Sequence, residues 1–190
     1  MKTRFGLAAF ALLAALSLIA SPARASDKGK TTEFDVHVGD TFIYGIGLAA
    51  VDIAGASSGD TIGLLFTGRM DVTDRDAEGD GAFQHFDPSG NLVDWGTFTA
   101  KRLISFTDLG SAAGFPQTWH RGIAKIWVHG VGQTVTFDAI LGVNCKFGPA
   151  PPPPPDYEEG TTFAIAGGLN FNMNVNDINV FNLFVAASED

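Results

Sequence analysis

The sequence predicts an all-β protein, a single-domain antiparallel β-barrel of about eight or nine strands with little helix. Apolar and polar residues alternate over long runs, glycine-rich turn sequences separate these runs, and helical periodicity is almost absent. A β-sandwich is the alternative. The length of the runs favours a barrel, because long strands coil strongly and closure removes exposed sheet edges.

Residues 1–25 are typical of a cleaved secretory signal peptide. Lys2 and Arg4 precede an apolar run over residues 5–20, and Ala23-Arg24-Ala25 fits the small-x-small rule for cleavage. The run is short for a membrane span. The protein is therefore expected to be exported, to the periplasm or the extracellular space, with no membrane contact after cleavage.

A disordered polar tail is expected over 26–33, followed by one β domain over 34–190. The alternating segments predict strands at 34–38, 41–48, 61–73, 92–106, 122–129, 134–147, 161–166, 169–175 and 178–186. Loops are expected at 49–60 and 107–121. The proline-rich segment 148–156 is expected to form a rigid crossover leading to the last strands, 161–186.

Charge and cysteine content exclude several classes of function. Three of the 12 basic residues and none of the 21 acidic ones lie in the signal, so cleavage changes the net charge from −9 to −12. Such acidity excludes nucleic acid as a partner. A single cysteine excludes an internal disulfide and a cysteine-based zinc site. Cys145 lies on the apolar side of its strand and is expected to be buried and inert.

An acidic segment between two expected strands contains candidate ligands for a calcium ion. Calcium is the one cofactor that the sequence suggests. Its pattern resembles the first half of an Asp-x-Asp-x-Asp-Gly calcium loop, and its candidate ligands are Asp74, Asp76, Glu78 and Asp80. The position of the bidentate glutamate in an EF-hand is occupied by His85, and helical flanks are missing, so an EF-hand is excluded. The alternative is a solvated hairpin tip.

Candidate ligand-binding residues lie in the long internal loop, which contains Phe115, Trp119, His120 and Arg121. Long loops in compact domains often carry function, and histidine and arginine beside aromatic rings suit a carbonyl or carboxylate ligand. The alternative is that the two aromatic residues plug one end of the barrel.

In the expected strand 92–106, the charged residues Asp94 and Arg102 stand at the same alternate positions as the apolar residues, which puts them on the same face of a regular strand. If the strand is regular, they point inward and Arg102 could anchor the acid group of a ligand. If the strand is bulged near Gly96, both turn outward.

The expected function is non-catalytic binding of a small apolar or amphipathic molecule by an exported barrel. Nucleophile-elbow, zinc-protease, phosphate-loop and Cys-x-x-Cys motifs are all missing from the sequence. Two alternatives stay open: an extracellular structural or adhesive module, and a cofactor-free barrel isomerase or cyclase, which would leave no motif.

Overall fold

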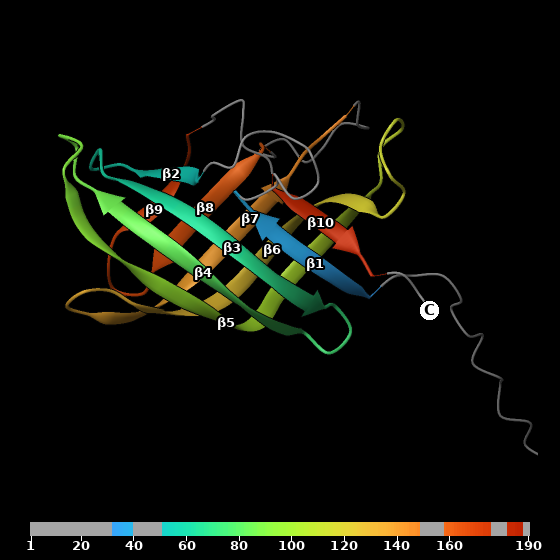
Figure 1. The fold of residues 1–190 in the computed structure, drawn as a ribbon, viewed down its shortest axis with the longest axis horizontal. Helices are drawn as coiled ribbons and strands as arrows, with labels where there is room; N and C mark the ends of the chain where they lie inside the picture. Colours follow the sequence, from blue (N-terminus) through green and yellow to red (C-terminus); the bar gives the residue numbers. More distant parts are fainter. Residues whose placement is uncertain (1–31, 40–50, 149–157, 176–181, 188–190) are drawn as a thin grey trace, which may run out of the picture. The chain divides into compact units, whose positions relative to one another are not determined.

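A computed structural model describes residues 32–39, 51–148, 158–175 and 182–187. In this part of the chain there are ten antiparallel strands and no helix (Figure 1). The strands are β1 (Glu33–Val38), β2 (Asp52–Ala56), β3 (Thr61–Asp71), β4 (Asp76–Phe86), β5 (Leu92–Gly110), β6 (Trp119–Val131), β7 (Thr136–Cys145), β8 (Gly160–Ile165), β9 (Asn170–Asn174) and β10 (Leu183–Ala186). The described residues include no helix long and apolar enough to cross a membrane.

The strands form one sheet that closes on itself, which confirms the predicted antiparallel barrel. Starting from β6, the neighbours are β5, β4, β3, β2, β9, β8 and β7, and β7 pairs again with β6. The register from Gly122↔Cys145 to Val131↔Thr136 closes the ring by continuous pairing.

Two separate sets of strands connect β3 to β6, so the wall of the barrel divides into two arms on this side. The first half of β3 pairs with β2 and its second half pairs with β1. In the same way, β6 pairs first with β10 and then with β7. The strands β1 and β10 pair with each other, so they form one arm of the wall, and β2, β9, β8 and β7 form the other (Figure 1).

A row of alternating phenylalanines and glycines crosses the barrel from β3 to β7. The residues in register are Phe66, Gly81, Phe98, Gly130 and Phe137. A Cβ atom at Gly81 would lie 2.2 Å from the Phe98 ring, and one at Gly130 would lie 2.3 Å from the Phe137 ring. The glycines therefore leave the space that the rings occupy.

Further phenyl rings fill the interior at this level. The centroid of the fully buried Phe163 ring lies 5.4 Å from that of Phe98 and 6.1 Å from that of Phe137. Cys145 is also fully buried, as predicted, and its thiol donates to the carbonyl of His120.

Several elements differ from the sequence prediction. The expected loop 49–60 contains β2, whose small residues, glycine and alanine, give a weak strand signal. Strand β4 begins at Asp76, within the expected acidic turn, and the expected loop 107–121 is shortened at both ends by β5 and β6. The expected signal peptide (1–25), the strand 41–48 and most of the proline crossover lie outside the described residues.

Candidate functional site

A cluster of buried polar side chains lies where the wall divides. Asn182 immediately precedes β10 and is 1% exposed, and Asp52 begins β2 in the other arm and is 5% exposed. The amide nitrogen Nδ2 of Asn182 donates to Asp52 Oδ2 at 2.9 Å and to the carbonyl oxygen of Asn144 at 3.2 Å. One amide therefore joins β10, β2 and β7.

Glu159 adds a second carboxylate to this cluster. Its Oε1 accepts a hydrogen bond from the backbone N–H of Asn182 at 2.7 Å, and its Oε2 accepts one from the backbone N–H of Lys146. Burial raises the pKa of Glu159 to about 8, against the opposing effect of these two hydrogen bonds. Burial also raises the pKa of Asp52, against the opposing effect of the hydrogen bond from Asn182.

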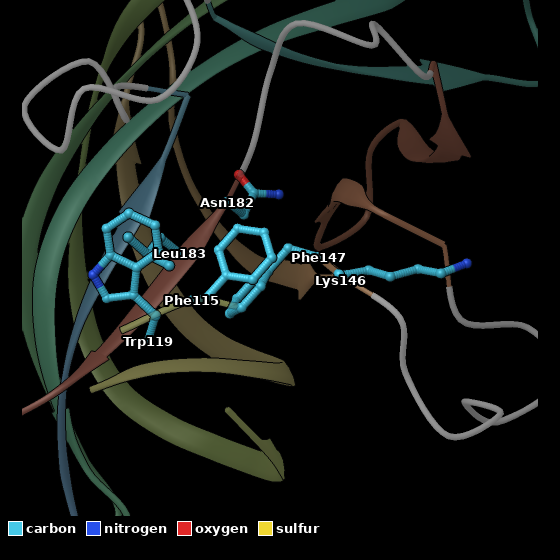
Figure 2. Close-up of a pocket in the computed structure, with 7 residues that line it drawn as sticks. Phe115, Trp119, Lys146, Phe147, Asn182 and Leu183 are labelled. Atoms are coloured by element: carbon cyan, nitrogen blue, oxygen red, sulfur yellow. The ribbon is translucent and has the colours of Figure 1, made fainter. Parts of the chain in front are cut away.

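An apolar pocket of about 460 Å³ lies beside the polar cluster and shares Asn182 with it (Figure 2). The other lining residues are Phe115, Trp119, Lys146, Phe147, Gly148 and Leu183. The ring centroid of Phe115 lies 4.8 Å from that of Phe147 and 6.3 Å from that of Trp119. This volume is within the range of pockets that hold small molecules, roughly 300–1,000 Å³.

The two polar side chains that line this pocket, Lys146 and Asn182, differ in direction and in burial. In Figure 2 the side chain of Lys146 extends away from the aromatic rings, whereas the amide of Asn182 lies on the side of the pocket where the rings meet Leu183. Lys146 is exposed, and Asn182 is buried. Asn182 is therefore the buried polar residue of the lining, and its amide is held by Asp52 and Asn144.

Two residues predicted from the sequence, Phe115 and Trp119, are brought together in this pocket. The connection between β5 and β6 holds them through two turns, in which Phe115 N donates to Ala112 O at 3.1 Å and Trp119 N to Pro116 O at 3.0 Å. Both rings are half-buried and line the same cavity.

The neighbouring His120 and Arg121 do not line this pocket. The Nδ1 atom of His120 lies 2.8 Å from Asp108 Oδ1. Arg121 is 5% exposed, and its guanidinium donates to three backbone carbonyls at the end of β5 and directly after it, those of Leu109, Gly110 and Ser111. These contacts tie both side chains to the end of β5 and to the start of the loop that follows it.

Arg102 turns outward at a bulge, but the bulge lies beside Arg102 and not near Gly96, since β5 pairs regularly with β4 from Asp94 to Thr99. Strand β5 has register shifts between Ala100 and Arg102 and again after Leu103, which leave Leu103 buried and Arg102 exposed. The guanidinium carbon of Arg102 lies 4.7 Å from the ring centroid of Trp127, at an outer groove of about 600 Å³. Asp94 instead accepts a hydrogen bond from the backbone N–H of Gln133 at 2.9 Å, in the β6–β7 hairpin.

The candidate calcium ligands are not gathered around a centre. Asp74 lies in the β3–β4 turn, while Asp76, Glu78 and Asp80 lie along the exposed side of β4. Side chains two residues apart on a strand are separated by about 7 Å, so this segment does not wrap around an ion. Among the described residues, no group of three or more His, Cys, Asp or Glu side chains is placed to hold a metal.

Asp52, Glu159 and Asn182 were not predicted from the sequence as site residues. Asp52 gave a usable signal, since it is a carboxylate inside an otherwise apolar run, Leu48 to Ala56. Such a residue is either exposed or a member of a buried polar group. Asn182 and Glu159 gave no comparable signal, because their proximity results from the pairing of distant strands.

Comparison with known proteins adds no relative: no protein-family model, curated protein or solved structure matches this chain.

Proposed function

We propose that this exported protein binds a small apolar or amphipathic molecule, without catalysis, in the pocket at the end of the β5–β6 connection. The observation that carries the proposal is the set of apolar walls formed by Phe115, Trp119, Phe147 and Leu183 around about 460 Å³. Half-buried aromatic rings around a cavity of this size provide apolar contact area for a ligand.

The position of the pocket also supports the proposal over binding in the barrel interior. Phenyl rings occupy the interior at the level of Phe98, Phe137 and Phe163. The pocket instead lies beside the division of the wall, where side chains come from three separate segments, the β5–β6 connection, the end of β7 and the start of β10.

Fluorescence of Trp119 tests the proposal directly. In a Trp95→Phe/Trp127→Phe protein, we expect the amphipathic probe 8-anilinonaphthalene-1-sulfonate to bind at one site and to receive energy from Trp119. Phe115→Glu places a charge on the pocket wall and is expected to weaken binding at least about tenfold.

Val135→Glu is the matched control, because Val135 is 54% exposed in the β6–β7 hairpin and does not line the pocket. This variant is expected to bind the probe as the parent protein does. If Phe115→Glu binds the probe normally and Val135→Glu does not, the exposed hairpin rather than the pocket is the binding surface, and the proposal is wrong.

A further inference from the structure

We infer that the outer groove beside Arg102 is a second binding site and that it takes a long-chain carboxylate, whose carboxylate pairs with Arg102 and whose chain lies across the sheet toward Asn170. The inference goes beyond the proposed function, because the groove and the pocket have no lining residue in common. It is carried by the row of residues that forms the groove and by the charge of Arg102.

One row of residues in register gives the groove its length. The row runs from β5 to β9 and consists of Arg102, Trp127, Ile140, Ala164 and Asn170, all of which line the groove. Residues in register on neighbouring strands point to the same face of a sheet. Four strand spacings of about 4.8 Å separate the two ends, so the row is about 19 Å long and suits an elongated ligand.

The row lies on the outer face of the barrel and exposes two large apolar side chains. Trp127 is 37% exposed and its partner in register, Ile140, is 41% exposed. Their neighbours in sequence, Ile126, Val128 and Leu141, are buried in the core. A ligand that covers Trp127 and Ile140 removes their apolar surface from water, which favours binding.

Arg102 is the one cation among the described residues that line the groove. Its guanidinium carbon lies 4.7 Å from the ring centroid of Trp127, so the ring holds the charge at the β5 end of the row. In the described part of the chain Arg102 forms no ion pair, and the carboxylate of the groove, Asp138, is paired with His129 at 2.9 Å. A ligand carboxylate matches the planar guanidinium and can accept two hydrogen bonds from it.

The lining favours an acyl chain over a sugar. Eight of the eleven described lining residues are apolar, and the three polar ones are Arg102, Asp138 and Asn170. A sugar has hydroxyl groups along its whole length, and burying them against apolar side chains costs free energy. The guanidinium also covers one face of the Trp127 ring, on which a sugar would stack. Because Asp138 repels an anion, the carboxylate of the ligand is placed at Arg102 and its chain over the apolar residues.

The fatty acid cis-parinaric acid and its methyl ester are the matched probes. Both have the same long chain, whose conjugated double bonds receive energy from tryptophan, but only the acid is charged. In a Trp95→Phe/Trp119→Phe protein, which keeps Trp127, we expect the acid to bind about fivefold more tightly than the ester, as a charge-assisted pair at an exposed arginine requires. The ester is the less polar molecule, so apolar burial alone would give the reverse order.

Two variants of this protein test the role of the charge. Arg102→Gln is expected to bring the affinities of acid and ester within about twofold of each other. Lys125→Gln removes the same charge from an exposed position on β6 that does not line the groove, so the preference for the acid should persist. Both residues are exposed, so neither substitution disturbs the core.

A second pair of variants tests the position of the chain. Ile140→Asn places an amide in the middle of the row and is expected to weaken both probes at least about threefold. Val131→Asn is the control, because Val131 is 49% exposed on β6 and does not line the groove. This variant is expected to bind both probes as the parent protein does.

The outcomes separate this inference from the proposed function. Equal binding of acid and ester, a preference that survives Arg102→Gln or is lost in Lys125→Gln, or equal effects of Ile140→Asn and Val131→Asn would each overturn the inference. If Phe115→Glu abolishes binding of the acid and Ile140→Asn does not, the acid binds in the pocket, so the inference fails and the proposed function stands. If the acid binds as expected while Phe115→Glu leaves 8-anilinonaphthalene-1-sulfonate binding unchanged, the proposed function fails and the inference stands.

Discussion

Arg121 shows how a charged residue beside aromatic side chains can serve the loop that carries them. Its guanidinium donates to the carbonyls of Leu109, Gly110 and Ser111, at 3.2 Å or less, while the residue is 5% exposed. These carbonyls lie at the end of β5, where the chain leaves the sheet for the connection that holds Phe115 and Trp119. The arginine therefore replaces the hydrogen bonds that a neighbouring strand would otherwise provide.

Arg121→Met tests this role. The methionine keeps an apolar stem but leaves three backbone carbonyls without their donor, so we expect a loss of about 3 kcal/mol in the free energy of unfolding, measured with urea. Lys125→Met, at an exposed position of the same strand, should change it by less than about 0.5 kcal/mol. Equal effects of the two substitutions would contradict the assignment.

At the scale of the element, β5 shows why odd or even position along a strand did not suffice to predict which side chains face the interior. Alternation placed Arg102 among apolar residues, but register shifts on both sides of it move Leu103 to the interior and Arg102 to the outer face. Alternation identifies a strand well because its period is fixed, whereas a bulge depends on the partner strand, which the local sequence does not reveal.

The row of phenylalanines and glycines also depends on how neighbouring strands pair, because it exists only when their residues are in register. We expect Gly130→Ala to destabilise the protein by about 2–3 kcal/mol, because its Cβ would lie 2.3 Å from the Phe137 ring. Adding Phe137→Leu should recover part of the loss, giving a favourable coupling in a double-mutant cycle. Gly55→Ala is the control, since its Cβ would lie no closer than 3.3 Å to its neighbours. Strict additivity of the pair would rule out this packing relation.

At the scale of the whole molecule, the carboxylates where the wall divides make stability depend on pH. The pKa of Glu159 is raised from 4.5 to about 8, so the folded protein holds a proton there that the unfolded chain releases between these values. The stabilisation is complete below the unfolded pKa and is lost as pH rises toward 8, with a slope of at most about 1.4 kcal/mol per pH unit from this group. The raised pKa of Asp52 acts in the same direction.

Urea unfolding between pH 5 and pH 8 measures this effect. Wild-type stability is expected to fall over the interval, and Glu159→Gln, which cannot titrate, should flatten the curve. Glu78→Gln is the control, because Glu78 is exposed on β4. A Glu159→Gln curve parallel to that of the wild type would show that Glu159 does not titrate in this range.

The sequence predicted the architecture better than the site for one physical reason. Alternation and turn chemistry are local, and they were sufficient for the barrel and the buried Cys145. Phe115 and Trp119 were named because a long loop carries them, and both line the pocket, while their contact with a ligand stays a prediction. The contact between Asn182 and Asp52 depends instead on which distant strands meet, and a single sequence carries no direct record of that pairing.

The pairing of β1 with β10 also has a consequence for the order of folding. Phe34 pairs with Ala186, so one arm of the wall is built from the first and last described strands. Contacts of such long sequence separation form late and slow folding, because the entropy of closing the intervening chain is lost before they form. The hairpins from β3 to β7 can assemble while the chain is still being made, but the final closure must wait for its last residues. Until β10 is made, β1 and the first residues of β6 each have an unpaired edge, and the newly made protein is most open to aggregation during this interval.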